Sequence, residues 1–419
     1  MRALSTVVRS VLLASVGLLL LGDRVALAAE SGLALELRPA KPAVVLGEPV
    51  YVTAVMRNRG PASVTVAPVL SLEASRLRYW VEDPKGKVRR YETWVAATIE
   101  GTPQRLYPGD EITATDMVWW QPRTGCAFPT PGDYGLTATF GDGRHSLRSH
   151  RVVLRVVSPR NEDATALPLI LGKEQGEFLQ VGSYQFQEGM KKLRELVAKH
   201  PRSTYAPYAE YALALRASRK GWFCPKPGSG QLDRIPPDYP QAITGFQQIV
   251  RDHPDCVVAD DAQYELARTH RDSGDQPAAR QALQRFLEVY AATSDRLPDA
   301  VTLSEELDWE HTSEAGALQT SDWRWIPLDK ALAGINAAVT WPLAGRRVSI
   351  TRRGTALGLE VGCPVATLGS RRLPLFALPT VQGDRMLVPE SLAPLLSRVL
   401  KQSRQWDPLP ARQSRGREN

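Results

Sequence analysis

Residues 253–256 read His-Pro-Asp-Cys and so place an imidazole, a carboxylate and a thiol within one short run. Such groups act as base, acid and nucleophile when a fold brings them together. Fifty-three residues earlier the chain reads His-Pro-Arg-Ser (200–203), so the histidine recurs while the carboxylate and the thiol do not. We therefore predict a structural role. His253 ends a helix near the negative end of its dipole, and Asp255 caps the helix that follows.

The densest cluster of potential metal ligands lies in the run SEELDWEHTSE (304–314). Hard cations favour carboxylate oxygens where several of them converge. We interpret residues 296–321 as an acidic linker, with a metal site as the alternative. The side chains concerned are Glu305, Glu306, Asp308, Glu310 and His311.

The sequence lacks the common catalytic motifs. Its six histidines form no HxH or HExxH pattern, and it has no P-loop, GxSxG elbow or dinucleotide-binding glycine motif. The formal net charge of +7 is mild for 419 residues. We expect no enzyme activity, no metal, no cofactor and no nucleic-acid partner. An enzyme whose site lies at a domain junction is the alternative from a different class.

The four cysteines are Cys126, Cys224, Cys256 and Cys363. Their spacings fit no zinc pattern. Cys224 and Cys256 fall in loops of the same predicted helical region. They are therefore the best candidates for a disulfide in an oxidising compartment, although a chain of this size does not require one.

The first residues have the pattern of a secretory signal peptide. Arg2 and Arg9 precede the apolar run VLLASVGLLLL (11–21), and small residues occupy the cleavage positions in Ala26-Leu27-Ala28. We expect residues 1–28 to be removed and the protein to be exported to the periplasm or the exterior, associated with the cell envelope, without an integral membrane segment. An uncleaved anchor is the alternative.

Residues 30–160 show the alternation of half-buried strands. In the run PVYVTAVMRN, for example, apolar residues occupy every second position from Val50 to Met56. The stretch FPTPGDYGLTATF resembles the entry to strand F of immunoglobulin-like domains. This resemblance implies an all-β sandwich and a corner tyrosine, Tyr134, that bonds to upstream backbone.

Residues 170–295 show helical periodicity and an internal repeat. Residues 186–221 align with 239–274 at the offset of 53, and 276–290 repeats the second helix at a further shift of 37. The pattern resembles the tetratricopeptide repeat, which implies an all-α array of stacked helix pairs. The residues that carry the resemblance are Ala242, Phe246, Ile249, Pro254, Leu266, Ala267 and Gly274. The insert 222–238 is rich in proline and glycine and predicts a surface loop.

In tetratricopeptide arrays the first helix of each pair lines a concave groove. The resemblance therefore implies that outward positions on residues 207–220 and 260–273 face such a groove. Tyrosine and arginine at these positions would anchor a protein partner. The candidates are Tyr208, Tyr211, Arg219, Tyr264, Arg268 and Arg271. Packing of Tyr211 and Tyr264 between repeats is the alternative.

Residues 322–402 contain short alternating strands between two phrases, Ile326-Pro327-Leu328 and Leu387-Val388-Pro389, each of which leads into a short helix. This order resembles the N-terminal-like domain of copper amine oxidases in bacterial envelope proteins. The resemblance implies a small α+β fold without copper, because the metal of the oxidases belongs to another domain. Asp329 and Glu390 replace arginines of the family's phrases, which puts any ligand of those arginines in doubt.

The last residues, 403–419, are basic and poor in apolar side chains, which predicts a disordered tail. The whole chain is thus expected to be multi-domain. We predict a non-enzymatic extracytoplasmic adaptor or scaffold that binds a protein partner through its tetratricopeptide groove. The alternative is an envelope-anchoring protein that binds cell-wall polymer through its terminal domains.

Overall fold

The structure is a computed structural model that describes residues 32–67, 70, 72, 76–94, 103–224, 233–307, 324–340, 347–352, 355–361, 363, 365–368, 371–382 and 385–401. The expected signal peptide and the expected basic tail lie outside these residues, so the structure does not test them.

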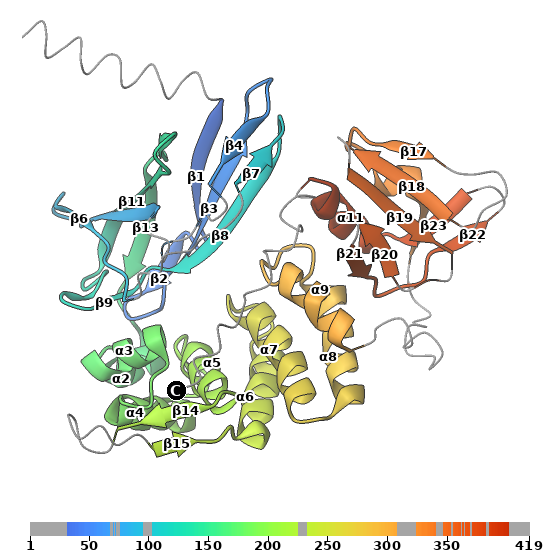
Figure 1. Ribbon diagram of the computed structural model, residues 1–419. Coiled ribbons are helices and arrows are strands. Elements are labelled where there is room, and N and C mark those ends of the chain that lie inside the picture. Colours follow the sequence, from blue (N-terminus) through green and yellow to red (C-terminus); the bar gives the residue numbers. More distant parts are fainter. Residues whose placement is uncertain are drawn as a thin grey trace, which may run out of the picture.

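The chain from 33 to 157 forms strands (Figure 1). Strands β1, β3 and β8 make a three-stranded sheet; the larger sheet has the order β2-β13-β11-β5-β6, with β12 also paired to β11. Two short pairs, β4–β7 and β9–β10, complete this β region. The strands are β1 (Leu33–Pro39), β2 (Ala43–Val45), β3 (Tyr51–Asn58), β4 (Val64–Val66), β5 (Leu77–Glu82), β6 (Val88–Arg90), β7 (Gln104–Leu106), β8 (Glu111–Met117), β9 (Trp120–Gln121), β10 (Gly125–Cys126), β11 (Gly132–Gly141), β12 (Ser146–Arg148) and β13 (Val152–Val157).

The two larger sheets share one hydrophobic core. Alternate residues of β1, β3 and β11 are buried, among them Leu35, Val52 and Leu136. Since successive side chains of a strand point to opposite faces, this alternation directs one face of each sheet inward. Tyr134 bonds to upstream backbone as predicted: its hydroxyl donates to the carbonyl of Thr130 at 2.9 Å.

Helices follow the β region from residue 161. They are α2 (Asn161–Ile170), α3 (Lys173–Val181), α4 (Gln187–Lys199), α5 (Ala206–Ala217), α6 (Tyr239–Asp252), α7 (Ala259–Asp272), α8 (Gln276–Val289) and α9 (Leu297–Glu306). Helix α2 lies before the expected boundary at 170. It contacts the repeats through hydrogen bonds: the amide and hydroxyl of Thr204, which lies between α4 and α5, donate to the carboxylate of Asp163 in α2 at 2.7 and 2.8 Å.

Helix α9 occupies part of the stretch that we interpreted as a linker, residues 296–321. Its apolar face, including Leu297 and Val301, is buried in the same core as α8. The acidic residues in the sequence of this helix therefore belong to an amphipathic element rather than to a solvated connection.

The two His-Pro runs end helices in the same way. His200 and His253 are the C-terminal cap residues of α4 and α6, with φ of −132° and −136°. The amides of Ser203 and Cys256 then donate to the carbonyls of these histidines, both at 3.1 Å. The predicted role of His253 is confirmed. The role predicted for Asp255 is wrong, because Val258 is the N-cap of α7 and no side chain caps that helix.

The insert 222–238 is only partly a loop. Strand β14 (Gly221–Phe223) pairs with β15 (Asp233–Ile235) in an antiparallel hairpin. Residues 225–232, between these strands, lie outside the described part of the chain.

The described residues of the C-terminal region form two sheets and two helices. The sheets have the orders β16-β23-β22 and β17-β18-β19-β20-β21. The elements are β16 (Trp325–Pro327), α10 (Leu328–Ala331), β17 (Ala338–Thr340), β18 (Arg347–Arg352), β19 (Thr355–Glu360), β20 (Val365–Leu368), β21 (Arg371–Pro374), β22 (Thr380–Gln382), β23 (Arg385–Pro389) and α11 (Leu392–Lys401).

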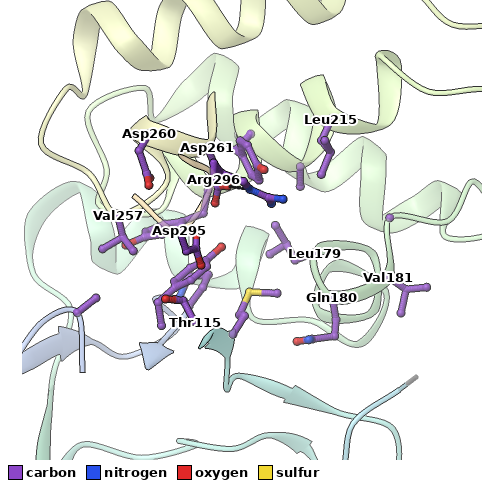
Figure 2. Close-up of a pocket in the computed structure, with 18 of the residues that line it drawn as sticks. Thr115, Leu179, Gln180, Val181, Leu215, Val257, Asp260, Asp261, Asp295 and Arg296 are labelled. Atoms are coloured by element: carbon purple, nitrogen blue, oxygen red, sulfur yellow. Dashed lines mark hydrogen bonds and ion pairs between the residues drawn. The ribbon is translucent and has the colours of Figure 1, made fainter. Parts of the chain in front are cut away.

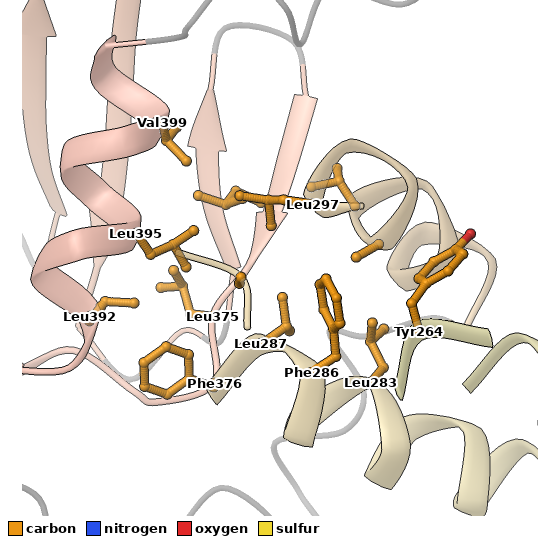
Figure 3. Packing of buried hydrophobic residues seen from close by; sticks show 14 of the residues in the cluster. Tyr264, Leu283, Phe286, Leu287, Leu297, Leu375, Phe376, Leu392, Leu395 and Val399 are labelled. Atoms are coloured by element: carbon orange, nitrogen blue, oxygen red, sulfur yellow. The ribbon is translucent and has the colours of Figure 1, made fainter. Parts of the chain in front are cut away.

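One hydrophobic cluster runs from the repeats into the C-terminal region. Figure 3 shows Phe286 and Leu287 of α8 near Leu375, Phe376 and Leu395 of the C-terminal region. The two regions therefore share a core and do not meet only through polar surfaces. Among the described helices, none is long and apolar enough to cross a bilayer.

Candidate functional site

A cavity of about 560 Å³ lies between the three-stranded sheet and the first helices of the repeats (Figure 2). Strands β3 and β8 form one wall, and α5 with the start of α7 forms the opposite wall. The end of α3 and residues 293–296 close its sides. The face of the repeats that we expected to be an open groove is therefore covered in part by the chain's own sheet.

A buried carboxylate holds the sheet against α5. Glu48 accepts hydrogen bonds from the Tyr208 hydroxyl at 2.9 Å, from the Lys41 Nζ atom at 2.6 Å and from the amide of Val45 at 3.0 Å. The rings of Tyr208 and Tyr51 stack at 6.1 Å between centroids. Burial and the neighbouring Glu48 carboxylate raise the pKa of Tyr208 far above its usual value, so its hydroxyl remains a donor.

The charged end of the cavity is built around Arg296, which follows α8. Its Nε atom donates to Asp261 at 2.5 Å. Burial, and then the adjacent carboxylate of Asp261, raise the pKa of Asp260 to about 6. The same two causes, in the same order, raise the pKa of Asp295. Figure 2 shows these three aspartates and Arg296 gathered on one side of the cavity.

Two hydroxyl side chains extend this polar surface onto the sheet. The hydroxyls of Thr53 on β3 and Thr115 on β8 lie 3.0 Å apart, and Thr115 hydrogen-bonds to Asp295. The side chain of Ser294 hydrogen-bonds to Asp260. The loop after α8 is thus linked to both the sheet and α7.

At the other end, Arg216 of α5 and Arg219, two residues after the end of this helix, line the cavity. The Arg216 guanidinium lies 4.4 Å from the centre of the Tyr184 ring and donates to the carbonyls of Arg219 and Lys220. Arg219 pairs with Glu265 at 3.2 Å, and Arg268 pairs with the same carboxylate at 3.0 Å. Glu265 is 1% exposed, so these two arginines compensate a buried charge.

The structure separates the six predicted partner-binding residues. Tyr208, Tyr211 and Arg219 line the cavity, whereas Tyr264, Arg268 and Arg271 are not part of its lining. Tyr264 is buried against the Phe286 ring at 6.1 Å, as the packing alternative expected. Arg271 pairs with Asp272 and Glu306.

The structure corrects the prediction that Tyr208 faces an open groove. It is 3% exposed, because Glu48 and Tyr51 of the β region cover it. The repeat register places this residue on the correct face of α5. It does not reveal that a sheet remote in sequence packs on that face.

The suggested disulfide is not formed. Cys256 is a thiol packed against the core of the repeats, and burial raises its pKa to about 11. Such a thiol is a poor nucleophile. Of the acidic run, Glu305 and Glu306 belong to α9, while Asp308, Glu310 and His311 lie outside the described residues.

Several cavity residues were missed, among them Asp260, Asp261, Asp295 and Arg296. Consecutive aspartates in the first turn of a helix are common, because they complement the helix dipole. That ordinary role hid the further contacts of Asp260 and Asp261. The sequence does carry one signal: acidic residues occur both in the first turn of α7, at 260–261, and shortly after α8, at 295.

The cavity can bind polar groups through its lining. It offers carboxylates, tyrosine hydroxyls and guanidinium groups, but its lining contains no histidine or cysteine. In the described parts of the chain, no three His, Cys, Asp or Glu side chains are placed to hold a metal ion.

Residues 261–293, which span most of α7 and all of α8, match the tetratricopeptide repeat family. Stacked helix pairs of such repeats form extended surfaces that bind other proteins. The chain therefore contains a tetratricopeptide repeat in its helical region, and this repeat contributes Asp261 and the loop at 293 to the cavity. No curated protein matches the sequence.

Solved structures give only weak similarities. A β-glucosidase from Listeria innocua is 12% identical over 30% of this chain and 16% of that one, with a TM-score of 0.18. The sporulation control protein Spo0M from Bacillus subtilis is 14% identical over 33% of this chain and 54% of that one, with a TM-score of 0.20. The chain thus spans about half of the length of Spo0M and far less of the glucosidase. At these TM-scores neither similarity supports an argument about fold or function.

Proposed function

We propose that the protein is a non-enzymatic extracytoplasmic adaptor whose tetratricopeptide region binds a segment of a partner protein. The observation that carries the proposal is the cavity on the first-helix face of a matched repeat. Its lining of tyrosine and arginine side chains, Tyr51, Tyr211 and Arg219 among them, has the composition of protein-binding surfaces.

In this proposal the β region is immunoglobulin-like and the C-terminal region resembles the copper-amine-oxidase N-terminal-like domain. Both regions flank the repeats and hold the walls of the cavity in place. The proposal of export is based on the signal-peptide pattern of residues 1–28. If it is correct, mass spectrometry of the exported protein should find a chain that begins at Ala29. A chain that retains Met1 would contradict export through a cleaved signal.

The test fills the cavity without removing a charge. Ala212 lines the cavity, and the variant Ala212→Phe places a benzyl group in its space. Val153→Phe places the same benzyl group at an exposed position of β13 and is the control. Both variants are first checked for wild-type helicity and a cooperative unfolding transition.

Immobilised mature protein is then exposed to solubilised envelope. We expect a protein that is retained by the wild type and by Val153→Phe and that is lost from Ala212→Phe. Retention of the same protein by all three, or by none, would refute binding in the cavity.

A further inference from the structure

A second groove, of about 570 Å³, lies where α4 and α6 flank α5. It uses a different face of α5 from the cavity: Glu210, Leu213 and Ala214 line this outer groove. Its walls are largely apolar, with Val197 from α4 and Pro240 from α6. Its volume is in the range of ligand-binding pockets. This surface is separate from the site of the proposed adaptor function.

A buried carboxylate faces this groove. Glu210 is 8% exposed, yet it makes no hydrogen bond or ion pair with any residue that the structure describes. Burial, and then the negative charge of Asp252, raise its pKa to about 7. A buried carboxylate without a partner is costly, so one that persists in a native fold calls for an explanation.

The charged groups around Glu210 do not neutralise it. Arg251 donates two hydrogen bonds to Asp252, at 2.8 and 2.9 Å. Arg194 of α4 lines the groove, but it is exposed and forms no ion pair with Glu210. Asp238 caps α6 by accepting from the amide of Gln241.

The next repeat provides an internal comparison. At the offset of 53, the position of Glu210 is held by Gln263, which is 3% exposed. The Gln263 amide donates to the carbonyl of Ala282 at 2.7 Å. The position of Ala282 corresponds to Gly245, and Glu210 lies beside Gly245: a Cβ atom there would be 3.7 Å from its Cγ atom.

The two repeats therefore place different chemistry at one position. The side-chain amide of Gln263 has a hydrogen-bond partner inside the fold, because its nitrogen donates to a carbonyl of the neighbouring helix. An ionised glutamate has only acceptor oxygens and cannot make that bond. Besides protonation and water in the groove, its means of compensation is a donor from a bound partner, and a cation is the strongest such donor.

We propose that the outer groove binds a partner polypeptide that inserts an arginine or lysine side chain beside Glu210, with apolar residues on either side packed on the groove walls. The apolar walls accept the stem and the flanking residues, and the carboxylate pairs with the cationic head.

The experiment uses the mature chain and a bead-displayed library of random hexapeptides. Wild-type protein is compared with Glu210→Gln, which reproduces the side chain of the next repeat and is expected to fold at least as well. Glu188→Gln removes an exposed carboxylate of α4, outside the groove lining, and is the matched control.

We expect wild type and Glu188→Gln to select peptides with a central arginine or lysine between apolar residues, and Glu210→Gln not to enrich basic residues. A selected peptide should bind Glu210→Gln at least tenfold more weakly at pH 8. Its affinity for the wild type should rise between pH 6 and pH 8 as Glu210 ionises, while its affinity for Glu210→Gln stays level.

The proposal would be overturned if the wild type selected no peptide, if the wild type and Glu210→Gln enriched the same residues, or if affinity did not change with pH. Selection of purely apolar peptides would show that the groove binds an apolar segment with Glu210 protonated, and it too would contradict an inserted cation.

Discussion

At the scale of single residues, buried carboxylates have unequal compensation in this chain. Glu48 has three donors and Glu265 has two arginines, whereas Glu210 has no partner in the described structure. The first two stabilise contacts between elements. Glu210, in contrast, is expected to lower the free energy of unfolding when it is ionised, and stability measurements at different pH values test this.

The variant Glu210→Gln should be more stable than the wild type at pH 8. The pKa of Glu210 is about 7 in the folded chain against 4.5 for the free side chain, so the folded state binds more protons between these values. Ionisation therefore destabilises the fold: stability falls as the pH rises from about 4.5 to about 7, and little more is lost at higher pH. Each pKa unit corresponds to about 1.4 kcal/mol, so the difference between 4.5 and about 7 sets an upper limit of about 3.5 kcal/mol for the gain of the variant at pH 8, which water in the groove reduces.

Urea unfolding at pH 5, 6, 7 and 8 measures this difference. The gain should be smallest at pH 5, increase up to about pH 7 and change little between pH 7 and pH 8, whereas Glu188→Gln should show no such trend. A constant difference between Glu210→Gln and wild type at all four pH values would mean that Glu210 does not titrate with a raised pKa.

At the scale of elements, the repeats follow from their sequence because their information is local. Asp238 and Asp275 cap α6 and α8 through the same bond to the third residue of each helix, at 3.0 and 3.1 Å. The His-Pro runs likewise end α4 and α6 in one conformation. Such short-range signals are readable from one chain.

Contacts between remote elements were not readable in this way. Nothing near Tyr208 in the sequence indicates that Glu48, 160 residues earlier, will cover it. The acidic composition of residues 296–321 predicts a linker, whereas in the structure Leu297, Val301 and Leu303 form a short buried face of α9. Burial of a short face depends on the neighbouring helix and C-terminal sheet, which local composition does not specify.

Removal of either aspartate cap should destabilise the repeats by a similar amount. Asp238→Ala and Asp275→Ala each leave one helix amide without its acceptor, at a cost of about 1 kcal/mol. Hydrogen exchange measured by mass spectrometry should show faster exchange in the first turn of α6 or α8 respectively, with no change in β11. Equal exchange in wild type and variants would contradict the capping role.

At the scale of the whole molecule, the C-terminal region is coupled to the repeats by both core packing and one arginine. Arg398 of α11 donates to the carbonyl of Ala291 at 2.8 Å and to that of Ser294. Ser294 and Asp295 also border the cavity through their bonds to Asp260 and Thr115. A change at α11 can therefore reach the charged end of the cavity.

The variant Arg398→Met should loosen this connection while it keeps most of the apolar stem. Loss of hydrogen bonds to a charged donor costs about 1.5–3 kcal/mol each. We expect faster hydrogen exchange in α11 and in residues 291–296, with β1 and β3 unchanged. Arg324→Met, which removes an exposed ion pair with Glu390, should leave exchange at 291–296 at the wild-type rate. The same acceleration in both variants would show that Arg398 has no special role.

The most direct test of the adaptor account places a photo-reactive benzophenone amino acid at position 212, inside the cavity, and at position 153, on the exposed face of β13. The proteins are produced in cells with the signal peptide intact, irradiated and analysed by mass spectrometry. The account predicts a covalent adduct with one envelope protein from position 212 and none with that protein from position 153. Adducts of the same protein from both positions, or none from position 212, would contradict a partner site between the sheet and the repeats.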